Sequence, residues 1–259
     1  MKKTLLFAAW FVSQGAIVHA APDPAPLYRQ HCVACHGVDR LGGLGPALLP
    51  QNLERLKKPE ALAVITAGRP ATQMQGFKDK LKADEIQALA DFIYTPPAVT
   101  PQWGEPEIRA SRYEAVKPGS LPDKPSFSAD PLNLFVVVEA GDHHVTILDG
   151  DKFEPIHRFP SRFALHGGPK FTPDGRYVFF ASRDGWISKF DIYNLKVVAE
   201  IRAGINTRNI AVSGDGQWVM AANYLPQTLV LLKAADLSLE RIIPVVNEAG
   251  KGSRVSAVY

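Results

Sequence analysis

Both cysteines of this 259-residue chain lie in one five-residue motif, in which Cys32 and Cys35 are followed at once by His36. At this C-x-x-C-H spacing two thiols can bind the vinyl groups of a porphyrin covalently, while the imidazole binds its iron. A thioredoxin-like redox pair would need a preceding strand, whereas residues 26–31 favour a helix, and a zinc site would need four ligands. The motif therefore predicts one covalent haem c on Cys32 and Cys35, with His36 as an iron ligand.

The second axial ligand is expected some tens of residues further on, and Met74 is the candidate. Met1 falls in a predicted targeting segment and Met220 lies far along the chain, whereas Met74 sits in the polar stretch 71–77. That stretch resembles the distal methionine loop of monodomain cytochromes c, and a thioether ligand raises the reduction potential of the iron. The alternatives are a loop methionine packed at the edge of the core, and ligation by His31, which lies beside the covalent attachment.

The surroundings of the motif favour a small helical domain. Glycines in residues 42–46 allow a loop to pass close to a porphyrin edge. Residues 59–67 fit a short helix, and residues 86–93 carry the apolar spacing of an amphipathic helix. We therefore expect an all-α cytochrome c domain at residues 21–97.

The first twenty residues are typical of a secretory signal peptide, with Lys2 and Lys3, an apolar run at residues 5–12 and cleavage after Ala20. A membrane anchor is the alternative, but residues 13–15 interrupt the run before the roughly 20 apolar residues that a span needs. No later stretch is long enough. We expect export to the periplasm. The net charge of +3 is too small to favour nucleic acid or an anionic membrane as a partner.

The second half of the sequence differs from the first in its composition and in its apolar pattern. Residues 98–130 are rich in proline, and we expect an ordered, extended linker that runs over a surface rather than through a core. Short strand-like runs follow, at residues 134–138, 145–148, 177–181, 187–190, 197–201, 218–222 and 229–232.

These runs repeat along the chain. Asp174 and Asp215 open similar turns 41 residues apart, and Asp149 and Asp191 end similar runs 42 residues apart. A repeat of about 40–45 residues with four short strands is typical of a β-propeller blade. A β-sandwich with coincidental turns is the alternative. Residues 131–259 suffice for about three blades, and closed propellers need at least about four, so we expect a C-terminally truncated member of a longer family.

A haem c motif, a proline-rich linker containing Trp103-Gly104 and propeller-like repeats together resemble the cytochrome cd family. The resemblance covers most of residues 25–245. Members of that family join a c-type domain to an eight-bladed propeller that holds haem d1. The resemblance implies a partial propeller of about three blades and a second tetrapyrrole, either haem d1 or dihydro-haem d1, bound without covalent bonds.

The resemblance also implies residues that contact the second tetrapyrrole. Residues 163–166 are similar to the segment whose histidine binds the iron of haem d1, which makes His166 the candidate ligand. Arg183 and Arg208 match positions where arginines meet the carboxylates of the macrocycle, and guanidinium groups suit bidentate pairing with carboxylates. Tyr224 falls where the family keeps an aromatic residue near the ring.

Two activities are known in the family, and the sequence favours one of them. The nitrite-reducing branch passes electrons from haem c to haem d1 and forms nitric oxide. The other branch oxidises a propionate of dihydro-haem d1 to an acrylate and passes the electrons to haem c. Residues 139–141 stand where the reductase has an arginine-bearing strand end, and no long acidic extension precedes Cys32.

The resemblance therefore predicts a haem d1 biosynthesis enzyme. Its expected partners are the tetrapyrrole, a nitrite reductase that receives haem d1 and a small redox protein that accepts electrons. A plain electron-transfer cytochrome c is the third hypothesis. No catalytic residue is assigned, because the general base is expected in blades beyond residue 259.

Overall fold

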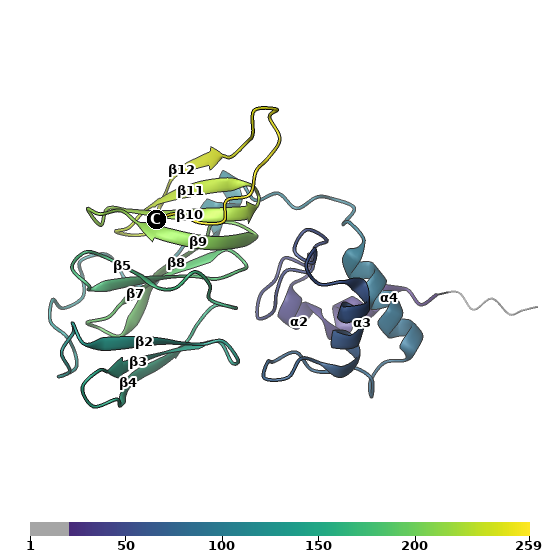
Figure 1. Ribbon diagram of the computed structural model, residues 1–259, viewed down its shortest axis with the longest axis horizontal. Helices are drawn as coiled ribbons and strands as arrows, with labels where there is room; N and C mark the ends of the chain where they lie inside the picture. Colours follow the sequence, from purple (N-terminus) through teal and green to yellow (C-terminus); the bar gives the residue numbers. More distant parts are fainter. Residues whose placement is uncertain (1–20) are drawn as a thin grey trace, which may run out of the picture.

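The helices and strands occupy successive parts of the chain in the computed structural model, which describes residues 21–259 (Figure 1). Helices come first and three antiparallel sheets follow, so the predicted class of an all-α cytochrome c region followed by propeller-like blades is confirmed. The predicted signal peptide at residues 1–20 lies outside the described residues. Within residues 21–259, no helix combines the length and the apolar character needed to cross a bilayer.

Four helices form the first part: α1 (Pro24–His31), α2 (Val33–His36), α3 (Lys58–Ala67) and α4 (Ala83–Tyr94). Helix α1 begins where the Asp23 carboxylate accepts a hydrogen bond from the Ala25 amide at 3.0 Å. Helix α4 buries the predicted stripe of Ile86, Leu89 and Ile93 in a cluster shared with α1 and α3. The helices thereby enclose one small apolar core.

The segment at residues 98–130 differs from its predicted form. It contains helix α5 (Glu105–Ser111) and strand β1 (Tyr113–Glu114), which pairs with β8 (Lys196–Arg202). Ile108 is 1% exposed and belongs to the core cluster of the sheets. The expectation of an extended segment lying outside any core was therefore wrong. The helix is short, and a single apolar side chain on it gives no periodic signal.

Three antiparallel sheets follow one another along the chain (Figure 1). The first contains β2 (Leu134–Glu139), β3 (His144–Asp149) and β4 (Pro155–Pro160). The second contains β5 (Lys170–Phe171), β6 (Tyr177–Ala181), β7 (Trp186–Asp191) and β8, with β1 at its outer edge. The third contains β9 (Asn206–Val212), β10 (Trp218–Leu225), β11 (Thr228–Lys233) and β12 (Leu239–Pro244).

The predicted repeat corresponds to equivalent turns in successive sheets. The carboxylate of Asp174 accepts from the Arg176 amide at 3.1 Å, and that of Asp215 accepts from the Gln217 amide at 3.0 Å. The glycine that follows each aspartate has a φ of 70°, a conformation that glycine adopts without strain. The 41-residue spacing therefore marks the same turn, between β5 and β6 in one blade and between β9 and β10 in the next.

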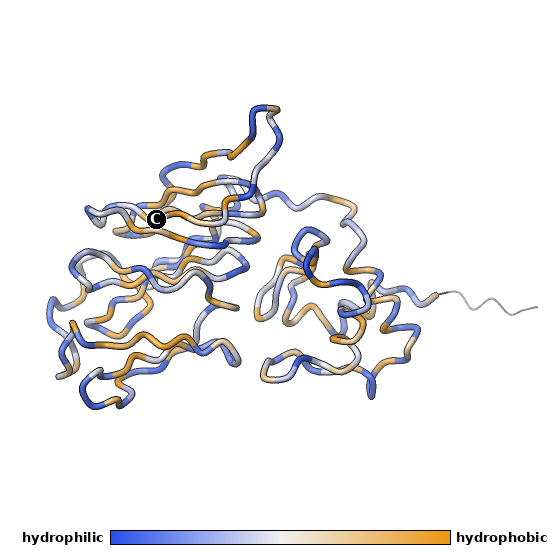
Figure 2. The backbone as a smooth tube through the Cα atoms, in the orientation of Figure 1, coloured by the Kyte–Doolittle hydropathy of each residue, from blue (hydrophilic) through white to orange (hydrophobic). Residues whose placement is uncertain are grey.

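The core of the blades lies between the sheets. Phe179 and Ile187 of the second sheet, and Ile210 and Val230 of the third, belong to one cluster, and none has measurable exposure. Hydrophobic segments follow the central strands and hydrophilic segments follow the turns (Figure 2). Neighbouring sheets therefore pack face to face, as blades do.

An apolar contact joins the helical part to the sheets. Ala47 and Leu49, from the loop before α3, form a cluster with Ile205, which precedes β9, and each is 1% exposed. A side chain at the end of β8 adds a polar contact, because the Arg202 guanidinium donates a hydrogen bond to the main-chain oxygen of Leu41. One end of the blades is thereby fixed against the loop that follows the haem-attachment motif.

Candidate functional site

The imidazole of His36 is oriented by the main chain. Helix α2 ends at His36, which is 7% exposed, and the ring Nδ1 donates to the Pro46 carbonyl oxygen at 2.8 Å. Burial lowers the pKa of His36, so the neutral ring with its Nε2 lone pair is favoured. A Cβ atom at Gly45 would lie 2.8 Å from the His36 Cε1 atom, so only glycine lets the loop approach this closely.

The two thiols stand beside this imidazole as free cysteines. Burial, followed by the neighbouring Cys35, raises the pKa of the Cys32 thiol to about 11. A catalytic redox thiol has a lowered pKa, whereas burial shifts the pKa of Cys32 in the opposite direction. Two thiols next to a neutral, fixed imidazole fit the covalent attachment of a haem.

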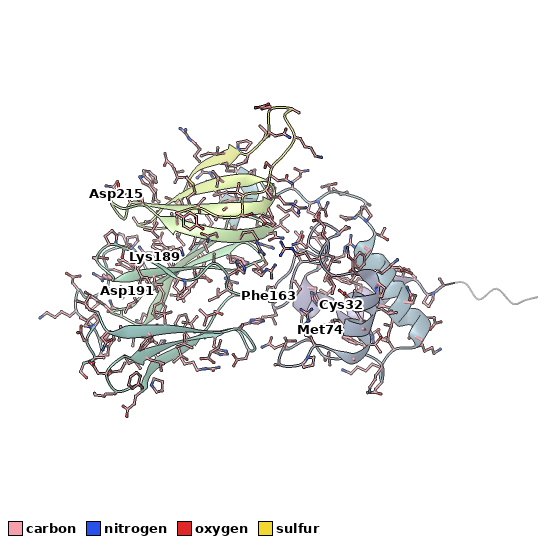
Figure 3. All side chains as sticks on the ribbon, viewed as in Figure 1. Cys32, Met74, Phe163, Lys189, Asp191 and Asp215 are labelled. Atoms are coloured by element: carbon pink, nitrogen blue, oxygen red, sulfur yellow. The ribbon has the colours of Figure 1, made fainter. Side chains whose placement is uncertain are left out.

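Met74 lies in the loop between α3 and α4 and packs against the same apolar cluster as Cys32. Figure 3 labels both residues in the helical part. The loop is held by a hydrogen bond from the Arg69 amide to the Met74 carbonyl oxygen, at 2.9 Å. The alternative ligand His31 ends α1 and packs edge-on against Phe77, with ring centroids 5.9 Å apart. The contacts of Met74 place it at the same apolar cluster as Cys32, which is compatible with the prediction that Met74 binds the iron.

A second group of candidate residues gathers at one end of the blades. His166 precedes β5, Arg183 follows β6, Arg208 lies near the start of β9, and Tyr224 lies near the end of β10. Because neighbouring strands are antiparallel, these positions share one end of the sheets. This end is the one that faces the helical part, where Arg202 reaches Leu41.

The ring of His166 is fixed in the same way as that of His36. Its Nδ1 donates to the Arg208 carbonyl oxygen at 2.8 Å, which leaves Nε2 with an available lone pair. A Cβ atom at Gly167 would lie 3.1 Å from that same oxygen, and the φ of Gly167 is 84°. In Figure 3, Phe163 lies at the edge of the sheets that faces the helices. His166 thus resembles an imidazole prepared to bind a metal.

Positive charge accumulates beside His166. Within residues 21–259, neither Arg183 nor Arg208 forms an ion pair with a carboxylate. The guanidinium carbon of Arg208 lies 5.0 Å from the centroid of the Tyr224 ring. The buried side-chain oxygens of Asn206 and Asn209, on the same strand as Arg208, have no hydrogen-bond partner. Uncompensated guanidinium groups fit a ligand that carries carboxylates, whereas the two asparagine oxygens require hydrogen-bond donors.

Three arginines at the boundary between the helical part and the blades were not identified from the sequence: Arg55, Arg202 and Arg254. Arg202 is buried at the end of β8, and Arg254 donates to the Glu54 carboxylate at 2.5 Å. An arginine that ends an apolar strand is the only sequence signal, and it points to Arg202 alone. The other two are brought to the boundary by the packing of distant segments.

Comparison with known proteins places the chain in a family. Residues 129–259, more than half of the chain, match the family model described as "Cytochrome D1 heme domain". The chain therefore belongs to the cytochrome D1 heme domain family. Residues 19–93 match a second model, described as "Cytochrome C oxidase, cbb3-type, subunit III". Together the two matches confirm the resemblance to cytochrome cd proteins.

Particular relatives are similar at very different levels. The chain is 62% identical over 246 residues to the dihydro-heme d1 dehydrogenase of Pseudomonas aeruginosa, covering 95% of this chain and 50% of that protein. A solved structure, "Dihydro-heme d1 dehydrogenase NirN in complex with DHE", matches with a TM-score of 0.84 and 62% identity, covering 92% of this chain and 51% of that one. A nitrite reductase of Stutzerimonas stutzeri is 24% identical, covering 90% of this chain and 44% of that protein. The chain spans about half the length of these relatives.

Proposed function

We propose that the chain is the haem c domain and first blades of a periplasmic enzyme that oxidises dihydro-haem d1. One observation carries the proposal: His166, Arg183 and Arg208 lie together at the end of the blades that faces the haem-attachment loop. The 62% identity to a dihydro-heme d1 dehydrogenase supports the choice of this branch over the nitrite-reducing one.

Haem c, when bound, supplies a one-electron acceptor. Cys32 and Cys35 would hold it through thioether bonds, and His36 and Met74 would bind its iron. The Pro46 carbonyl accepts from Nδ1 of His36 and thereby fixes the tautomer that leaves the Nε2 lone pair available to an iron. A thioether ligand favours the reduced iron and so suits an acceptor.

The substrate would be bound through its iron and through the carboxylates on one edge of the macrocycle. The Nε2 of His166 is the atom that would bind the iron, with Nδ1 held by the Arg208 carbonyl. The guanidinium groups of Arg183 and Arg208 would pair with carboxylates of the macrocycle, and the Tyr224 ring supports the Arg208 side chain. Charge pairing on one edge fixes the orientation of the flat substrate.

The reaction removes two hydrogens from a propionate side chain. The CH2–CH2 segment next to the carboxylate becomes CH=CH and releases two protons and two electrons. The two electrons would leave one at a time through the one-electron acceptor that Cys32, Cys35, His36 and Met74 would hold, and a small redox protein is suited to receive them. The product, haem d1, is the cofactor of a nitrite reductase, which makes that enzyme the expected recipient.

Anaerobic mixing of the oxidised haem c holoprotein with dihydro-haem d1 tests the proposal. We expect the absorption bands of reduced haem c and, after extraction, a product lighter by two hydrogens. Matched variants Arg208→Gln and Arg109→Gln separate the site from general charge, because Arg109 is exposed on α5 and pairs with Glu105.

Two results would support other functions. Rapid formation of nitric oxide from nitrite by the reduced, haem d1-loaded protein would support a nitrite reductase. A holoprotein that binds no second tetrapyrrole would support a plain electron-transfer cytochrome c.

A further inference from the structure

A surplus of positive charge spans the boundary between the helical part and the blades. Arg183 and Arg208 belong to the blades, whereas Arg55 belongs to the loop before α3. In the described part of the chain, none of the three forms an ion pair with a carboxylate. Unpaired guanidinium groups contributed by two structural units that contact each other suit a site for an anion.

An ion pair and a stacked ring position Arg55 at this boundary. The neighbouring carboxylate of Glu54 accepts from Arg254 at 2.5 Å. The guanidinium carbon of Arg254 lies 5.6 Å from the centroid of the Tyr224 ring, and that of Arg208 lies 5.0 Å from the same centroid. The Tyr224 hydroxyl is in turn within 2.9 Å of the Ser256 hydroxyl. These contacts hold the loop that carries Arg55 beside the ring that supports Arg208.

Like charges in this cluster already affect one another. Burial, then the charge of Arg208 and then that of Arg55, lowers the pKa of Arg183. Glu54 does not compensate the cluster, because its carboxylate is engaged by Arg254. Arg55 and Arg183 are exposed, so solvent and salt screen part of the repulsion between these guanidinium groups, and a bound anion would remove more of it.

We propose that Arg55 is a substrate-positioning residue that lets the haem c domain take part in binding the carboxylates of the tetrapyrrole. This inference rests on the proposed function and deepens it. A polycarboxylate bridging Arg55 and Arg183 is held by both units at once. Substrate binding thereby fixes the distance between the propionate that is oxidised and haem c. Contacts from the blades alone would not fix that distance.

The test compares the haem c holoprotein with its variants Arg55→Gln and Arg29→Gln. Arg29 is a matched control, because it is an exposed arginine on α1 of the same domain. Two probes are used at low ionic strength: dihydro-haem d1, followed by absorption titration, and the tricarboxylate citrate, followed by the shift in melting temperature. Removing one charged hydrogen-bond donor is expected to weaken each affinity about tenfold. Arg29→Gln should bind like the wild type.

The outcomes separate this inference from the function on which it rests. If Arg55→Gln binds both probes as tightly as the wild type, the role of Arg55 is overturned. If the wild type binds citrate through Arg55 but does not bind dihydro-haem d1, the anion site stands and the proposed function fails. If the wild type binds neither probe, both fail.

Discussion

Substituting Arg202 tests how the helical part and the blades are held together. The Nε atom of Arg202 donates to the Asp184 carbonyl oxygen at 2.8 Å, and Nη2 donates to the Leu41 carbonyl oxygen. The guanidinium carbon also lies 4.5 Å from the centroid of the Trp103 ring. Arg202→Met keeps much of the side-chain volume but removes both hydrogen bonds and the charge. The Leu41 and Asp184 carbonyl oxygens then lose a donor at a buried boundary.

The expected loss follows from these contacts. Each hydrogen bond from a charged donor contributes about 1.5–3 kcal/mol to stability. The variant no longer buries a guanidinium charge, which offsets part of the sum of the two bonds and leaves a loss of roughly 3 kcal/mol in the free energy of unfolding. For a chain of this size we expect the melting temperature to fall by about 6–12 °C. The haem c holoprotein would be melted while circular dichroism reports the strands and Soret absorbance reports the haem domain.

The loss should depend on pH because Asp184 is also buried. Burial raises the pKa of the Asp184 carboxyl, while the Ser182 hydrogen bond and the charge of Arg202 lower it. A carboxyl with a raised pKa in the folded state costs stability as the pH rises through that pKa. Without Arg202 the pKa rises further, so Arg202→Met should be least destabilising at acidic pH, and adding Asp184→Asn should restore part of the loss at neutral pH.

A matched control shows whether the loss of stability is specific to the contacts of Arg202. Arg109→Met removes an exposed arginine that pairs with Glu105 on the same helix, and we expect the free energy of unfolding to change by no more than about 0.5 kcal/mol. If Arg202→Met melts within about 2 °C of the wild type at neutral pH, the Arg202 contacts do not join the two parts as argued.

Three further predictions concern single side chains. Burial lowers the pKa of Lys189 to about 8. Between pH 8 and 10.5 only the unfolded lysine holds its proton, so the stability of the wild type relative to Lys189→Met should rise with pH in this range. Denaturant titrations that show a constant difference in the free energy of unfolding would contradict this. Met74→Ala should remove the thioether–iron absorption band of the oxidised holoprotein and lower its reduction potential; an unchanged band would exclude Met74 as the ligand. Gly45→Ala should cost about 1–3 kcal/mol, because the new Cβ meets the His36 ring; denaturant unfolding measures it, and an unchanged midpoint would show that the loop can move.

The sequence predicts the parts of the fold that carry strong local signals. The C-x-x-C-H motif and the stripe of α4 are local patterns, and the central strands are continuous apolar runs. The edge strands β4, β5, β9 and β12 were not predicted, because these strands are short or carry several polar residues and owe their form to pairing. Helix α5 was missed because Ile108 alone marks its buried face.

The residues of the candidate site likewise fall into two groups, those with a local sequence signal and those without one. His166, Arg183, Arg208 and Tyr224 could be proposed from resemblance, because each lies in a recognisable segment. Arg55 could not, because it lies more than a hundred residues before Arg183 in the chain and reaches the cluster only through the packing of the haem-attachment part on the blades. Contacts between distant segments are set by the whole fold and leave no local pattern.

The main chain of Arg208 and its side chain have separable tasks. The carbonyl oxygen orients His166, and the guanidinium lies over Tyr224. Since every amino acid has a carbonyl group, replacing residue 208 alters the charge presented to a ligand without disturbing the imidazole. Under the proposed function, divergence at this position would therefore change which ligand carboxylates are bound, while the main-chain contact that orients His166 would be kept.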